Sequence, residues 1–85
     1  MPSKTVAVGS SVGLHARPAQ LIAEAAEELG VEVLIGIPGD EPVDASSSLM
    51  IMTLGAACGD LVEVSSEDQN ALDTIVSLVE KDLDA

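Results

Sequence analysis

The chain has 85 residues, of which 47% are hydrophobic, and its formal net charge is -12 at pH 7. The length predicts a single domain over residues 1–85, and the hydrophobic content excludes the disordered acidic chains that bury too little apolar surface to fold. The acidic balance repels nucleic acid and anionic membranes, and a chain with one cysteine and one histidine offers neither an intrachain disulfide nor a metal-ligand cluster.

The N-terminal third of the chain predicts a strand, a loop and a helix. Residues 4–8 read as a short strand with Val6 and Val8 on one face. A glycine- and serine-rich loop follows, and Gly30 is a natural stop for the helix after it. That helix is predicted over residues 16–29, and its apolar positions are Leu21, Ile22, Ala25, Ala26 and Leu29.

The middle of the chain predicts a hairpin. Apolar residues alternate through residues 31–37, which indicates a strand with one buried face. Residues 38–40 form a Pro-Gly-Asp turn, and a weak strand over residues 41–44 completes the hairpin. Pro42 places this second strand at a sheet edge, because proline donates no ladder hydrogen bond.

The C-terminal half predicts two helices around one strand. Serines cap a short helix within residues 45–55, which Gly55 ends, and residues 60–65 form a strand with inward valines. Residues 66–69 predict a capping box, in which the Ser66 hydroxyl bonds the Gln69 N–H. The last helix carries an apolar stripe of Leu72, Ile75, Val76, Val79 and Leu83. The order β-α-β-β-α-β-α, with short connections, predicts an α+β layer with helices on one face of a small sheet.

The candidate functional site lies in residues 13–18, Gly-Leu-His-Ala-Arg-Pro. His15 is the only histidine, and Arg17 is one of three basic residues. A helix start offers N–H groups and a positive dipole end to an anion, and an imidazole is a nucleophile near neutral pH. His15 can therefore carry a phosphoryl group whose oxygens Arg17 grips. The alternative is a surface-loop histidine beside a solvated arginine.

This segment resembles the active-site motif of the HPr family, the histidine-containing phosphocarriers of the bacterial phosphoenolpyruvate-dependent sugar phosphotransferase system. The resemblance covers the whole chain and implies an open-faced β-sandwich, a four-stranded antiparallel sheet covered by three helices. It also implies that His15 accepts phosphate on Nδ1, as pros-phosphohistidine, from Enzyme I and passes it to the IIA domain of a sugar permease. Ala16 and Pro18 support the site, Pro18 by shaping the helix start, and Arg17 assists transfer. Such a protein is a stoichiometric carrier without a cofactor, not an enzyme.

Residues 47–55 resemble the family segment that begins with a regulatory serine and ends in Ser/Thr-Leu-Gly. Counting back from Gly55 selects Ser47, whereas counting forward from His15 selects Ser46. An insertion near the turn at residues 38–42 reconciles the two counts in favour of Ser47. A serine kinase is the partner that this resemblance implies, and helix capping is the alternative role of the serines.

The chain departs from the family pattern in two respects. Glu24, Glu27 and Glu28 stand on the first helix, where family members often carry basic or apolar residues. We therefore expect either a partner more basic than a typical Enzyme I or function at high salt. Ser48 occupies a place where the family has a bulky apolar residue. Residues 50–52, Met-Ile-Met, fit either a core without aromatics or a partner surface.

Two further functions stay open. One is a regulatory interaction module that acts through the serine helix, and the other is an HPr-like carrier for a nitrogen-related or dihydroxyacetone kinase relay. A hydrolase is disfavoured, because no base, metal or carboxylate pair accompanies His15. Without a signal peptide or a membrane-length apolar run, we expect a cytoplasmic monomer, not inserted in a membrane, in which Cys58 is incidental.

Overall fold

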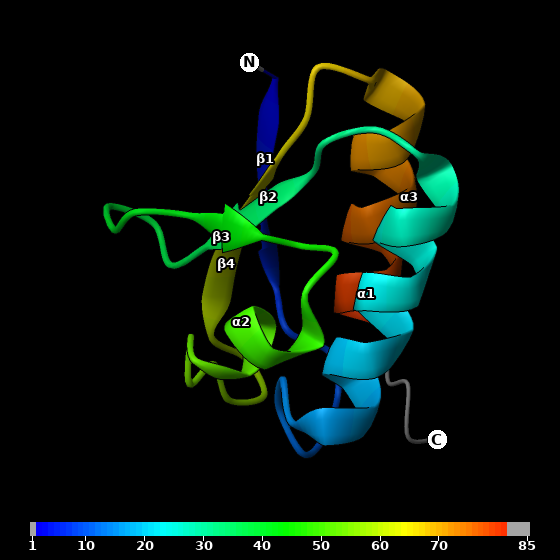
Figure 1. Cartoon of the computed structure of the whole chain (residues 1–85). Helices are drawn as coiled ribbons and strands as arrows, with labels where there is room; N and C mark the ends of the chain where they lie inside the picture. The colour runs from blue at the N-terminus through cyan, green and yellow to red at the C-terminus, as the bar shows by residue number, and fades with distance from the viewer. Residues whose placement is uncertain (1, 82–85) are drawn as a thin grey trace.

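The structure is a computed structural model that describes residues 2–81. Its elements follow the predicted order β-α-β-β-α-β-α (Figure 1). The strands are β1 (Ser3–Ala7), β2 (Leu34–Gly36), β3 (Val43–Asp44) and β4 (Leu61–Ser65). The helices are α1 (Ala16–Leu29), α2 (Ser48–Met52) and α3 (Gln69–Glu80).

The strands form one antiparallel sheet in the order β1-β4-β2-β3. In this register Val6 faces Val62, and Ile35 faces Val64. Helix α3 packs on β1 and β4, while α1 packs beside α3 and against α2, so the helices gather on one face of the sheet (Figure 1). The architecture confirms the α+β open-faced sandwich, with β3 at the sheet edge directly after Pro42.

The core between the sheet and the helices is aliphatic. Val6, Val62 and Val64 point into it from the sheet, and Ile22 and Ile75 meet them from α1 and α3. In α1 the buried side chains are Pro18, Ala19, Ile22, Ala23 and Ala26. The predicted stripe is confirmed at Ile22 and Ala26, and the half-buried Ala25 and Leu29 pack against the core, whereas Leu21 is half-buried outside it. In α3 the stripe is confirmed at Leu72, Ile75 and Val79, Val76 is half-buried, and Leu83 lies outside the described residues.

The predicted capping box of α3 is wrong. Helix α3 begins at Gln69 and its N-cap is Asp68, whose Oδ1 accepts from the Ala71 N–H at 3.1 Å. The buried Ser66 hydroxyl instead donates to the Glu32 carbonyl at 2.8 Å and accepts from the Asp68 N–H at 3.2 Å. The Ser66 hydroxyl thus bonds a carbonyl that is 34 residues away in the sequence. Local sequence spacing does not reveal such a contact.

The bounds of every strand and of α2 also differ from the predictions, most of all in β2, in β3 (Val43–Asp44 instead of residues 41–44) and in α2. Strand β2 is short because its pairing with β4 begins at Leu34, which faces Ser65 at the end of β4; before it, the Val33 carbonyl accepts the Ala45 N–H at 2.9 Å. Helix α2 ends at Met52 with Thr53 as its C-cap, and Gly55 serves the turn after it with a φ of 64°. Gly30 does end α1 as predicted, in the left-handed conformation.

Candidate functional site

His15 is the N-cap residue of α1. Its backbone is extended, and its carbonyl accepts the Ala19 N–H at 2.9 Å, which closes the first turn of the helix. The side chain makes no capping hydrogen bond and is exposed. The imidazole therefore stands at the helix start and is available to a molecule that approaches from solvent.

The loop before His15 is anchored at both ends. The Gly9 N–H donates to the Val79 carbonyl at 3.0 Å, which ties the loop to the end of α3. Leu14 is 3% exposed, and its N–H donates to the Ala56 carbonyl at 2.9 Å. Gly13 has a φ of 76°, and a Cβ there would lie 2.6 Å from the Ala56 oxygen. Only glycine fits this approach, so the loop presents His15 from a fixed backbone.

The first turn of α1 is suited to an anion. Pro18 is buried at the third helical position, where its missing N–H costs no intrahelical bond. The Ala16 and Arg17 N–H groups have no acceptor within the helix, and the first turn contains no acidic residue. The positive end of the helix dipole thus lies beside His15, and the exposed Arg17 adds a full charge two residues away. The structure places the four predicted residues, His15, Ala16, Arg17 and Pro18, together in this turn.

The two candidate serines occupy different environments. Ser47 is the N-cap of α2, and its Oγ accepts from the Met50 N–H at 3.3 Å. Ser46 lies one residue earlier, and its N–H and hydroxyl donate to Asp44 Oδ1 at 2.9 and 2.7 Å. These two hydrogen bonds, the backbone one foremost, hold the pKa of Asp44 below its ordinary value. Because α2 packs against α1, the serine segment belongs to the same side of the fold as the His15 helix.

The methionine segment contains both buried and exposed residues, so its core interpretation is confirmed for part of it. Ile51 is fully buried, and the half-buried Met52 packs on the core. Met50 is 41% exposed, and its neighbour Leu49 is 69% exposed.

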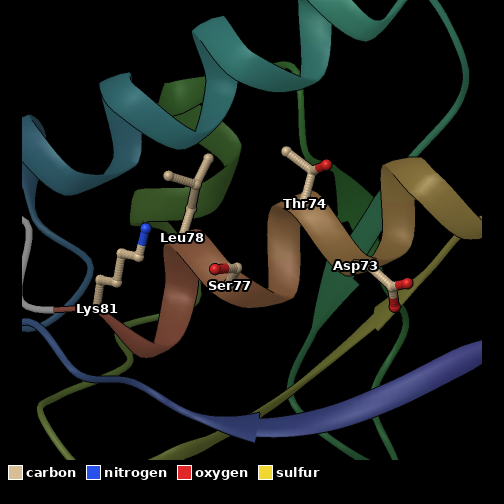
Figure 2. A pocket seen from close by; sticks show the side chains of 5 residues that line it. All are labelled: Asp73, Thr74, Ser77, Leu78 and Lys81. Carbon is tan, nitrogen blue, oxygen red and sulfur yellow. The ribbon is translucent and has the colours of Figure 1, made fainter.

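A hollow lies along α3, whose last turn is bonded to the loop before His15. It is lined by Asp73, Thr74, Ser77, Leu78 and Lys81 (Figure 2). Asp73 and Lys81 stand at opposite ends of this row, and Asp73 is tied to Lys4 of β1 at 3.2 Å. That bond, followed by one from Gln69, holds the pKa of Asp73 below its ordinary value. The hollow therefore gathers no reactive pair, and the candidate site is the start of α1.

Within residues 2–81, no group of three or more His, Cys, Asp or Glu side chains is arranged to hold a metal ion. Over the same residues, no helix has the length and apolar character needed to cross a bilayer.

Comparison with known proteins supplies independent findings. Residues 2–81 match the family described as PTS HPr component phosphorylation site. The chain is 37% identical to the phosphocarrier protein HPr of Streptomyces coelicolor, covering 99% of this chain and 94% of that one. It is 31% identical to the HPr-like protein Crh of Halalkalibacterium halodurans, covering 96% and 100%. The structure of HPr-C-His from Thermoanaerobacter tengcongensis superposes with a TM-score of 0.87 at 30% identity, covering 100% and 98%.

The open-faced sheet and the family match place the molecule in the class of small phosphocarrier domains, whose general role is phosphoryl transfer. The chain belongs to the HPr family of the phosphotransferase system.

Proposed function

We propose that this chain accepts a phosphoryl group on Nδ1 of His15 from Enzyme I, itself charged by phosphoenolpyruvate, and passes it to the IIA domain of a sugar permease. The observation that carries the proposal is the exposed imidazole of the only histidine, at the N-cap of α1. In this proposal the protein is a cytoplasmic, monomeric, stoichiometric carrier, and it needs no cofactor.

The first transfer requires a neutral imidazole. Its Nδ1 lone pair attacks phosphorus, the bond from phosphorus to Enzyme I breaks, and the electron pair of that bond stays with Enzyme I. In the second transfer a nucleophile of the IIA domain attacks the same phosphorus, and the pair of the P–N bond returns to Nδ1. Nε2 keeps its proton through both steps, so no general base is required.

The site holds a phosphoryl group loosely. The start of α1 and Arg17 supply positive potential, but the site is open to solvent and the imidazole is exposed. A carrier benefits from this arrangement, because tight binding of the phosphorylated state would trap the intermediate. Exposure also lets two partners reach His15 in turn.

The proposal is tested by incubating the chain with phosphoenolpyruvate and the Enzyme I of the same genome, and measuring intact mass at alkaline pH. The wild type should gain one phosphoryl group and His15→Ala none. His15→Ala should keep its circular dichroism and melting temperature, because an exposed side chain leaves no cavity. A variant that still gains the group would show that His15 is not the acceptor.

We further propose that Ser47, rather than Ser46, is the residue through which a serine kinase regulates the carrier. A phosphate on Ser46 would lie against the Asp44 carboxylate that its hydroxyl now contacts at 2.7 Å. Ser47 caps α2, where added negative charge is locally tolerated. New charge there would instead disturb the partner-facing surface beside α1.

The matched pair Ser47→Asp and Ser46→Asp separates the two serines. Ser47→Asp should slow Enzyme I-dependent phosphorylation while keeping the fold, whereas Ser46→Asp should lower the melting temperature through repulsion by Asp44. The rates are measured at low and at high salt. Rates for Ser47→Asp equal to wild type at both salts would leave Ser47 as a helix cap and nothing more.

A further inference from the structure

A single peptide group in the loop before β4 holds the backbone that presents His15. The Ala56 carbonyl accepts the Leu14 N–H at 2.9 Å, and Leu14 directly precedes His15 in the chain. The two segments touch here, because a Cβ on Gly13 would lie 2.6 Å from the Ala56 oxygen and 2.9 Å from the Ala57 Cα. The orientation of the peptide group between Ala56 and Ala57 therefore sets where His15 stands.

The opposite side of this peptide group is bound by Asp60. The Asp60 Oδ2 accepts the Ala57 N–H at 2.9 Å. In a trans peptide the N–H and the carbonyl are coplanar and point in opposite directions. The Asp60 carboxylate and the Leu14 N–H thus bond the same planar group from its two sides. A hydrogen bond to an ionised acceptor also polarises the peptide and makes its carbonyl a stronger acceptor for Leu14.

The turn that contains Asp60 is closed without this carboxylate. The Asp60 N–H donates to the Ala57 carbonyl at 3.0 Å. Two more backbone hydrogen bonds join the turn to Val8, just after β1: the Val8 N–H donates to the Asp60 carbonyl at 2.9 Å, and the Gly59 N–H donates to the Val8 carbonyl at 2.8 Å. All three bonds remain when the side chain is removed. The exposed carboxylate therefore adds control of the peptide group ahead of the turn.

We propose that Asp60 is a positioning residue for phosphoryl transfer, which fixes Leu14, and hence His15, through the peptide group between Ala56 and Ala57. The inference rests on the proposed function and extends its site to the turn before β4. Attack on phosphorus needs the imidazole within a narrow range of positions, and a displacement of about 1 Å can cost about a hundredfold in rate. Asp60 itself forms no bond in the transfer.

The test compares Asp60→Ala and Asp60→Asn with the charge-matched control Asp40→Ala, at an exposed position in the turn between β2 and β3. Amide hydrogen exchange is measured by nuclear magnetic resonance for the Leu14 N–H, with the N–H of Ile75, inside α3, as the reference. Rapid-quench reactions with phosphorylated Enzyme I give the limiting rate constant of transfer and the concentration for half-saturation.

In Asp60→Ala the Leu14 N–H should exchange about tenfold faster, and the limiting rate constant should fall about threefold to tenfold. The half-saturating concentration and the Ile75 exchange should stay within about twofold of wild type, as should every measurement on Asp40→Ala. Asp60→Asn should recover to within about threefold of wild type, because its amide oxygen can still accept the Ala57 N–H.

Four results would overturn the inference. In the first, Asp60→Ala matches Asp40→Ala in exchange and in rate. In the second, Leu14 and Ile75 exchange faster by the same factor, which assigns Asp60 to the stability of the whole fold. In the third, only the half-saturating concentration changes, which assigns Asp60 to contact with the partner. In the fourth, Asp60→Asn is as slow as Asp60→Ala, which assigns the effect to charge.

Failure of the proposed function gives a different result. A wild type that gains no phosphoryl group overturns that function and, with it, the role of Asp60 in transfer. A wild type that gains the group, beside an Asp60→Ala variant that reacts like the Asp40→Ala control, overturns the role of Asp60 alone.

Discussion

His15 and Arg17 divide the work of the site at the scale of single residues. In the proposed function, His15 forms the bond to phosphorus, while Arg17 contributes charge and hydrogen-bond donors from the first turn of α1. We predict that Arg17→Ala slows phosphoryl transfer by roughly tenfold to a hundredfold, the usual worth of a hydrogen bond to a charged group. Rapid-quench kinetics in both directions measure the effect. Arg17→Lys should recover part of the loss, because it keeps the charge without the planar fork.

If Arg17→Ala leaves the transfer rates unchanged in both directions, Arg17 is a solvated surface charge that takes no part in transfer. The position of both residues was predictable, because Gly13 and Pro18 bound the segment and mark a turn and a helix start. The hydrogen bond that anchors the loop before His15 was not predictable. Leu14 is held by the carbonyl of Ala56, far away in the sequence, and local spacing carries no information about such a contact.

At the scale of elements, the N-cap of α3 offers the clearest test of the structure. Asp68→Ala removes the acceptor of the Ala71 N–H and should cost about 1 kcal/mol of folding free energy. For a domain of this size that corresponds to a fall in melting temperature of about 4–8 °C. Gln69→Ala is the matched control and should change little, because Gln69 does not close a capping box. Equal losses in the two variants would contradict the cap at Asp68.

The buried faces of long periodic segments were predictable from the sequence, whereas the capping residues of the helices were less so. The apolar stripe of α3 and the inward valines of β4 follow from their spacing, because one face of each element is buried. Residues 66–69 match the capping-box pattern in sequence, but the Ser66 hydroxyl donates its hydrogen bond to the Glu32 carbonyl instead. The short β2 likewise depends on where its partner β4 ends, which is a property of the assembled sheet.

Charge dominates at the scale of the whole molecule. The chain has 15 acidic and 3 basic residues, and the ion pair between Lys4 and Asp73 is exposed at both ends. We predict that the melting temperature rises as salt increases from about 0.01 M to 1 M, because the Debye length falls from about 30 to 3 Å and self-repulsion is screened. Calorimetry across this range measures the rise.

A Glu24→Lys, Glu27→Lys and Glu28→Lys variant, with its smaller net charge, should show a weaker dependence on salt. A melting temperature that is flat or falls with added salt would show that repulsion does not limit stability. Composition alone predicted the acidic surface, but not its distribution. That the carboxylates of α1 share one exposed face with Arg17 follows only once the buried side of the helix is known.

The central claim, that His15 Nδ1 carries the phosphoryl group, is tested most directly by nuclear magnetic resonance. Because the chain has one histidine, ¹⁵N-labelled imidazole gives a single pair of ring nitrogen signals. After reaction with phosphoenolpyruvate and Enzyme I, the Nδ1 signal should shift and show coupling to phosphorus, while Nε2 keeps its proton. A chain that gains a phosphoryl group with both ring nitrogens unchanged, or with the coupling at Nε2, would contradict the account.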